Sequence, residues 1–222
     1  MSVTVSDAAG NTRIESITVY LDTTPPSITI TSPTNGGSVN TNTLTLTGTT
    51  NDSTAQITIN GTAATITNNT FTAQITLSEG SNTVTVTAKD SLGNTRTSSI
   101  TIYLDTTAPT VSSTYPAFNE TDVPLNSSIT ATFSEAMQSS TLTSSTLTLS
   151  NNGTNISGSV TYSGSTATFT PSQNLSPETI YTATIKGGSS GVKDIAGNPL
   201  SGDYIWQFKT APAMELTITA PS

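Results

Sequence analysis

The sequence predicts an all-β chain built from β-sandwich modules that follow one another in tandem. Three observations lead to this fold class. Apolar residues alternate with Thr and Ser over short runs, and this period of two is typical of half-buried strands. Clusters of Gly, Asn, Asp and Pro separate the runs, as expected for turns. A segment also repeats, because residues 3–26 match residues 86–109 at an offset of 83.

The composition narrows the possible functions. Charged residues make up 9% of the chain, the net charge is -8, and there are six basic residues. So few basic residues cannot form a phosphate-tracking surface, so neither nucleic acid nor an anionic membrane is an expected partner. No apolar run reaches about 18 residues, so no membrane insertion is predicted. Without Cys, the modules of an extracellular chain lack disulfides, and a bound metal is an alternative source of stability.

Residues 1–24 contain one copy of the repeat and little else. Both copies read Asp-x-x-Gly-Asn-Thr-Arg, followed by Tyr-Leu-Asp-Thr-Thr. Gly and Asn tolerate positive φ, so each Gly-Asn pair predicts a turn between two strands. Because an isolated hairpin is marginal in water, we interpret residues 1–24 as the closing hairpin of a preceding, truncated module. Met1 leads directly into a strand-like run rather than a signal peptide, so we expect a fragment of a longer chain.

Residues 25–107 are expected to form a complete module. Asn60-Gly61 lies between two alternating runs and is a strong signal for a two-residue hairpin. The predicted strands are 27–32, 43–48, 55–60, 63–67, 71–77, 82–88 and 98–104. Seven short strands with closely spaced turns are typical of an Ig-like sandwich.

Residues 108–212 are expected to form a second, longer module. Its strand-like runs are 109–116, 129–134, 167–171, 181–185 and 204–210, and a helical turn is predicted at 139–142. Trp206 and Phe208 alternate on one run, so we expect a core Trp rather than a sugar-stacking one. Residues 213–222 resemble the start of the first module and are interpreted as the first strand of a following module.

These patterns resemble known bacterial families. Residues 25–107 are similar to the Ig-like repeats of large surface adhesins, which also occur as accessory domains of secreted glycoside hydrolases. Residues 108–212 resemble the Ig-like domain of S-layer proteins. The residues that carry the two resemblances are Asp90-x-x-Gly93-Asn94 and Leu104–Pro109 for the first module, and Pro116, Asp122-Val123-Pro124, Phe133–Met137, Asp194-x-x-Gly197-Asn198 and Phe208-x-Thr210 for the second. The resemblance implies an extracellular or cell-surface module that calcium often stiffens at its joints.

The topology of an Ig-like sandwich predicts two clusters of carboxylates. We call the segments Tyr20–Pro26 and Tyr103–Pro109 joints, because each links one module to the next. The loops after the second and sixth strands of a module, the B–C and F–G loops, lie at the end where the chain enters, beside the preceding joint. The expected clusters are Asp22 with Asp52 and Asp90, and Asp105 with Glu135 and Asp194. Ca²⁺ takes about 6–8 oxygen ligands, so we predict these six side chains as its ligands. The alternative is that each Asp accepts hydrogen bonds from its own turn and binds no metal.

No enzymatic activity is predicted from the sequence. His and Cys are absent, which removes the usual catalytic triads and zinc sites. The remaining carboxylates are not accompanied by an aromatic groove for a sugar.

The main functional hypothesis is a non-enzymatic structural or adhesive spacer of a bacterial surface protein. Its expected partners are neighbouring Ig-like modules of the same chain or like subunits, with a surface glycan or a protein receptor as a further candidate. A carbohydrate-binding accessory module of a secreted enzyme and a self-assembling filament or S-layer subunit are the two alternatives. Fold alone does not choose among them.

Overall fold

The computed structural model describes residues 1–214 and confirms the all-β fold class. Apart from one 3₁₀ turn at Ser139–Thr141, where a helical turn was predicted, each regular element of these residues is a strand. No helix within the described part of the chain is long and apolar enough to cross a membrane. The chain divides into two compact units. The first contains residues 1–36, 43–76 and 83–101, and the second contains residues 37–42, 77–82 and those from 102 onward.

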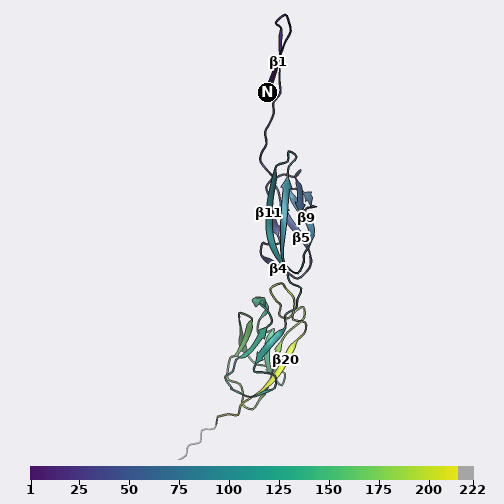
Figure 1. Cartoon of the computed structure of the whole chain (residues 1–222). Helices are drawn as coiled ribbons and strands as arrows, with labels where there is room; N and C mark the ends of the chain where they lie inside the picture. The colour runs from purple at the N-terminus through teal and green to yellow at the C-terminus, as the bar shows by residue number, and fades with distance from the viewer. Residues whose placement is uncertain (215–222) are drawn as a thin grey trace, which may run out of the picture. The chain divides into compact units, whose positions relative to one another are not determined.

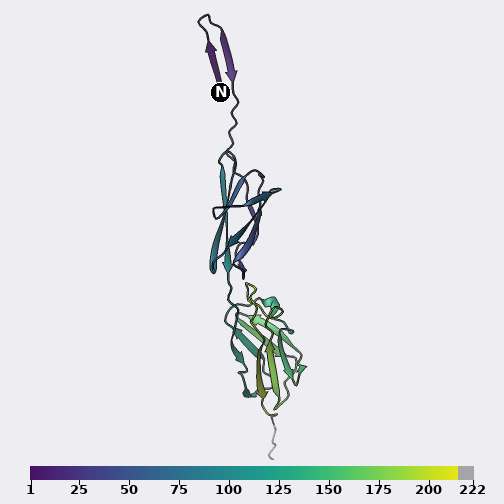
Figure 2. The same ribbon diagram turned by 90° about the vertical axis from the view of Figure 1, so that its right-hand side faces the viewer.

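The first unit begins with an antiparallel hairpin of β1 (Ser2–Ser6) and β2 (Thr12–Ser16). Figure 2 shows the two strands side by side, and no other strand of the described residues pairs with them. Gly10 in the turn has a φ of 83°, a conformation that glycine adopts without strain. Every residue of the two strands is exposed. The hairpin therefore has no core of its own.

Residues 29–104 form a sandwich of two sheets. The four-stranded sheet has the order β3 (Thr29–Ser32), β5 (Thr43–Thr49), β9 (Thr70–Thr76), β8 (Thr65–Thr67), and Figure 1 shows β5 beside β9. The five-stranded sheet has the order β4 (Gly37–Val39), β11 (Thr95–Leu104), β10 (Gly80–Lys89), β6 (Gln56–Ile59), β7 (Thr62–Ala63). The alternating apolar residues, Leu46, Ile59, Phe71, Val86 and Ile102 among them, are buried between the sheets.

Two details of this sandwich differ from the sequence prediction. The single strand expected at 63–67 is two strands, because the chain passes from one sheet to the other at Ala64: β7 pairs with β6, whereas β8 pairs with β9. A strand was also missed at β4, where Asn35 and the glycines predicted only a turn. β4 pairs in parallel with the end of β11, and Asn35 Oδ1 accepts a hydrogen bond from Thr101 N (2.8 Å).

Residues 111–210 form a second sandwich. Its four-stranded sheet has the order β12 (Val111–Tyr115), β14 (Ile129–Phe133), β18 (Thr166–Pro171), β17 (Gly158–Ser163). Its five-stranded sheet has the order β13 (Glu120–Val123), β20 (Tyr204–Thr210), β19 (Ile180–Ile185), β15 (Leu147–Asn151), β16 (Thr154–Asn155). Trp206 lies in the core with 1% of its surface exposed, which confirms the predicted core role, and its ring lies 5.8 Å from that of Tyr204.

Each sandwich contains a strand glycine that leaves room for an aromatic ring. A Cβ on Gly48 would collide with the ring of Phe71, and a Cβ on Gly158 would collide with the ring of Phe169. Both phenylalanines are almost fully buried. The predicted strand at 213–222 lies outside the described residues, apart from its first two positions.

Candidate cation sites

The second unit contains a compact cluster of three carboxylates. One oxygen from each of Asp105, Glu135 and Asp194 lies within 4.8 Å of the others. Asp105 directly follows β11, Glu135 follows β14, and Asp194 lies in the loop between β19 and β20. Asp194 is fully buried, while the other two side chains are partly exposed. The structure thus brings together three residues that lie far apart in the sequence, as the topology predicted.

The buried Asp194 is oriented by its own turn. Its Oδ1 accepts hydrogen bonds from the backbone N–H of Gly197 (2.7 Å) and of Asn198 (2.8 Å), and its Oδ2 accepts one from Asn198 Nδ2 (2.8 Å). Gly197 has a φ of 98°, which few other residues adopt without strain. An ionised carboxylate offers about four acceptor sites, so these three bonds fix the side chain and still leave it able to bind a cation.

Asn198 also holds the joint residue of the cluster. Its Nδ2 donates to the backbone oxygen of Asp105 (2.8 Å), while Oδ1 of Asp105 accepts a hydrogen bond from Thr107 N (3.0 Å). The amide of Asn198 therefore contacts both Asp194 and Asp105. Sequence reasoning treated this Asn only as a turn residue and missed the second contact.

Within the described residues, no basic side chain forms an ion pair with this cluster. Burial raises the pKa of Glu135, and the nearby charges of Asp105 and Asp194 raise it further. In the described part of the chain, the one ion pair joins Arg13 and Glu15, which are distant in sequence from all three residues of the cluster. Each additional negative charge at the cluster is therefore unfavourable unless a proton or a cation compensates it.

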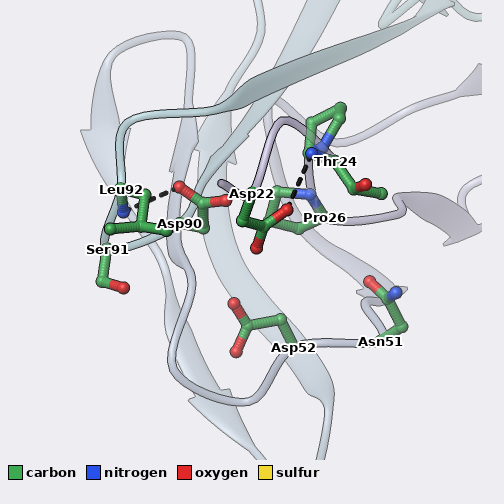
Figure 3. Close-up of a pocket in the computed structure, with 9 residues that line it drawn as sticks. Asp22, Thr24, Pro26, Asn51, Asp52, Asp90, Ser91 and Leu92 are labelled. Carbon is green, nitrogen blue, oxygen red and sulfur yellow. Dashed lines mark hydrogen bonds between the residues drawn. The ribbon is translucent and has the colours of Figure 1, made fainter. Parts of the chain in front are cut away.

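The first unit contains the other predicted group. Asp22, Asp52 and Asp90 line one hollow of about 300 Å³, together with residues such as Pro26 and Asn51. Figure 3 shows the three carboxyl groups gathered around this hollow. Among the described residues, only the cluster of the second unit has all its carboxylates within 4.8 Å, so this first group is more open.

The hydrogen bonds of the first group resemble those of the second, except for one backbone donor, which is Leu92 N at Asp90 and Gly197 N at Asp194. Asp90 Oδ1 accepts from the backbone N–H of Leu92 (2.9 Å) and of Asn94 (2.8 Å), and its Oδ2 accepts from Asn94 Nδ2 (2.8 Å). Asn94 Nδ2 also donates to the backbone oxygen of Asp22 (3.1 Å). Asn94 therefore contacts Asp90 and the joint residue Asp22, as Asn198 does in the second unit.

Two carboxylates of the first group are stabilised in their charged form. The side-chain hydrogen bond from Asn94 lowers the pKa of Asp90, and that from Thr54 lowers the pKa of Asp52. The charge of Asp90 raises the pKa of Asp52 by a smaller amount. The turn bonds expected for the metal-free alternative are thus present, and they favour the charged form of Asp52 and Asp90.

The same turn occurs a third time, in the β1–β2 hairpin. Asp7 accepts hydrogen bonds from the backbone N–H of Ala9 and Asn11 (both 2.9 Å) and from Asn11 Nδ2 (2.7 Å). The Asn11 side chain lowers the pKa of Asp7. Three occurrences of Asp-x-x-Gly-Asn are the sequence signal that could have revealed the role of Asn94 and Asn198.

Each of the two sandwiches matches a family model. Residues 105–210 match the family model of a bacterial Ig-like domain, and residues 26–106 match that of glucodextranase, domain B. The resemblance to bacterial Ig-like modules that the sequence predicted is therefore confirmed. None of the curated proteins matches the chain.

Solved structures similar to the chain include two of the bacterial S-layer protein SbsC. The N-terminal part of SbsC is 24% identical over 47% of this chain and 24% of that chain, with a TM-score of 0.37. The longer form rSbsC(31-844) is 24% identical over 51% of this chain and 15% of that chain, also at 0.37. The chain thus spans a quarter or less of the SbsC structures. The fibronectin(III)-like modules of Clostridium thermocellum CbhA are 16% identical over 88% of this chain and 100% of that chain, with a TM-score of 0.44.

Proposed function

We propose that the chain is a non-enzymatic spacer segment of a bacterial extracellular protein, and that Ca²⁺ fixes the joint residue of each Ig-like module to that module. The observation that carries this proposal is the cluster of Asp105, Glu135 and Asp194, whose carboxylates approach within 4.8 Å without a basic partner. The two family matches support the bacterial and extracellular setting.

The chemistry of the cluster suits a hard cation. Ca²⁺ prefers carboxylate, carbonyl and water oxygens and accepts irregular geometry. Asp105, Glu135 and Asp194 would supply three carboxylates, and water would complete the shell at the two partly exposed residues. The raised pKa of Glu135 favours its protonated form, and a bound cation would compensate the charge of the ionised form in place of that proton. The more open group of Asp22, Asp52 and Asp90 would bind the same ion more weakly.

A cation at this position would act on a joint that is already partly ordered. Asp105 N donates to Val39 O (3.0 Å), and Thr106 donates from N (3.1 Å) and Oγ1 (2.9 Å) to the carboxylate of Glu79. All these residues belong to the second unit. Short joints between modules leave hinge freedom, and a cation that binds Asp105 together with Glu135 and Asp194 would reduce it.

The stiffness of the joint can be measured directly. The chain has no cysteine, so Thr72→Cys and Thr161→Cys, both exposed, would each carry one spin label in a double variant. We expect the distribution of label-to-label distances to be narrower in millimolar Ca²⁺ than in EDTA. The same labels in an Asp105→Asn background should show a broad distribution in both conditions. An equal width with and without Ca²⁺ in the parent chain would refute the spacer mechanism.

A carbohydrate-contacting accessory module is the second candidate, because residues 26–106 match glucodextranase, domain B. Against it, Trp206 is buried, and the exposed aromatic residues of the described chain come from several separate segments: Tyr20, Tyr103, Tyr115, Phe118 and Tyr204. Affinity electrophoresis in gels containing soluble polysaccharides would distinguish the two candidates. Retardation that is lost in Tyr103→Ala would favour the accessory role, whereas unchanged mobility in every gel favours the spacer.

A further inference from the structure

The β1–β2 hairpin is a second copy of a hairpin that the first sandwich buries. Residues 3–24 align with residues 86–107, and the turn bonds agree: Asp7 N donates to Asn11 O (3.0 Å) as Asp90 N donates to Asn94 O (3.1 Å). In β1–β2, Thr4 lies opposite Ile14 and Ser2 lies opposite Ser16. The equivalent residues of β10–β11 also face each other, since Thr85 contacts Ser99 (3.1 Å) and Thr87 contacts Thr97 (3.5 Å).

The two hairpins differ in what covers their apolar residues. The six apolar positions of the first hairpin are Met1, Val3, Val5, Ile17, Val19 and Leu21, and their counterparts in the second are Val84, Val86, Ala88, Ile100, Ile102 and Leu104. The first set is between 53% and 88% exposed, whereas the second is between 0% and 9% exposed. Val3 and Val5 lie in β1, Met1 directly precedes it, and the other three residues follow β2. Exposed apolar residues that gather in one region mark an interaction surface.

Strand alternation places part of this set on one face. Val3 and Val5 point to the same side of β1, and Met1 joins them because alternate residues share a face. Met1 and Ile17 are paired by two backbone hydrogen bonds, Ile17 N to Met1 O (3.0 Å) and Met1 N to Ile17 O (3.1 Å). The apolar face therefore runs from Val5 and Val3 through Met1 to Ile17, while Arg13 and Glu15 lie opposite Val5 and Val3 on the same face.

The first sandwich shows which kind of partner fits such a face. There, β10 pairs with β6, with Val86 opposite Ile59 and Ala88 opposite Ile57, and β11 pairs in parallel with β4. The opposite sheet contributes Leu46 and Phe71 to the same core, each fully buried. A set of strands equivalent to β3–β9 would therefore fit the apolar face of the β1–β2 hairpin.

We propose that the apolar face of the β1–β2 hairpin is a docking surface for a polypeptide with the strand pattern of residues 26–83, and that the two together form one Ig-like sandwich. In this complex, β1 pairs with the β6 equivalent, so that Val3 lies opposite the counterpart of Ile59 and Val5 opposite that of Ile57. The inference goes beyond the spacer function, because it requires neither a cation nor a stiff joint.

Pairing between the hairpins of two copies is the competing arrangement. It would cover the apolar face but leave the outer backbone edge of each β1 without a partner strand. A sandwich partner would hydrogen-bond to that edge of β1 as β6 does to β10. Such pairing is needed because backbone donors and acceptors buried at an interface need partners. The sandwich partner is therefore favoured.

The direct test extends the chain. A copy of residues 26–83 is placed immediately before Met1, which then occupies the position equivalent to Val84. Amide hydrogen exchange in the hairpin should slow by on the order of 100-fold or more relative to the original chain, toward the protection of β10–β11. The matched control extends the chain with the same segment carrying Leu46→Asp and Phe71→Asp, and it should give no protection. Unchanged exchange in the intact extension would overturn the proposal.

Substitutions in the extended chain separate the possible partners. Val3→Asp should remove the added protection of the hairpin, whereas Thr4→Asp, on the opposite face of β1, should keep it. Concentration-dependent dimerisation of the original chain that Val3→Asp abolishes, with no added protection in the extended chain, would instead establish hairpin-to-hairpin pairing and overturn the proposal.

Discussion

The side-chain amide of Asn198 donates to the backbone oxygen of Asp105, 93 residues earlier, at 2.8 Å. The same nitrogen donates to the buried carboxylate of Asp194 at 2.8 Å. One side chain therefore fixes the position of the joint residue relative to the turn that supplies the buried carboxylate of the cluster.

Replacing Asn198 with Ala should destabilise the second sandwich. The change removes both donors and leaves the fully buried Asp194 with fewer hydrogen bonds, which costs about 1–3 kcal/mol in the free energy of unfolding. Urea denaturation measures this difference. Asn151→Ala is the control, because its Nδ2 also donates to a backbone oxygen, that of Ile180 (2.8 Å), at an exposed site. Equal losses in the two variants would show that the Asp105 contact has no special role.

Asn94→Ala should have a smaller effect than Asn198→Ala. Its bond to the joint oxygen of Asp22 is longer, at 3.1 Å, and Asp90 is partly exposed where Asp194 is buried. Water can replace the lost donors at the more open site. The free energies of unfolding of the two variants are compared unit by unit, so the measurement uses conditions in which the two units unfold in separate transitions. A greater loss for Asn94→Ala would contradict the relative order of the two sites.

The raised pKa of Glu135 predicts a specific pH dependence in EDTA. Between the ordinary pKa of Glu and the raised folded value, the folded chain binds more protons than the unfolded chain, so the Glu135 contribution to stability falls as pH rises through that window. Glu135→Gln lacks this titration. The unfolding midpoint of the parent chain minus that of Glu135→Gln should therefore decrease with rising pH in EDTA. A difference that increases with pH would contradict the assignment.

The packing of Phe71 against Gly48 predicts a steric effect. A methyl group at Gly48 would also lie 2.6 Å from the backbone oxygen of Thr29, so Gly48→Ala should cost about 1–3 kcal/mol in the free energy of unfolding. Gly202→Ala is the control, since nothing lies within 4 Å of its Cβ position. Thermal unfolding of both variants measures the effect, and a stable Gly48→Ala would require Phe71 to move at no cost.

Local sequence patterns predicted most of the strands of the first sandwich. Alternation and Asn-Gly turns predicted strands such as β6 and β19, because each has a clear apolar face and sharp ends. β17 was missed because Gly158 and the Ser and Thr residues around Val160 hide its alternation, and β4 was missed because its pairing with β11 is long-range. Nothing local to Ala64 shows that the chain changes sheets there.

The candidate site was predicted through topology rather than through a local motif. The position of loops at one end of a sandwich placed Asp105 near Glu135 and Asp194, and the structure brings these three together. The contact from Asn198 to Asp105 was missed, because an Asn that follows Gly is explained locally as a turn residue. The repeated Asp-x-x-Gly-Asn motif marks this Asn, but the spacing of the sequence does not show its partner 93 residues away.

Thermal unfolding in EDTA and in millimolar Ca²⁺ tests the central proposal most directly. An ion that binds only the folded chain must raise the unfolding midpoint by an amount set by its free concentration relative to Kd. We predict a rise in the parent chain and in Asp122→Asn, whose exposed carboxylate lies outside the cluster, and a much smaller rise in Asp105→Asn and Glu135→Gln. No rise in the parent chain, or an equal rise in all four proteins, would contradict the calcium site.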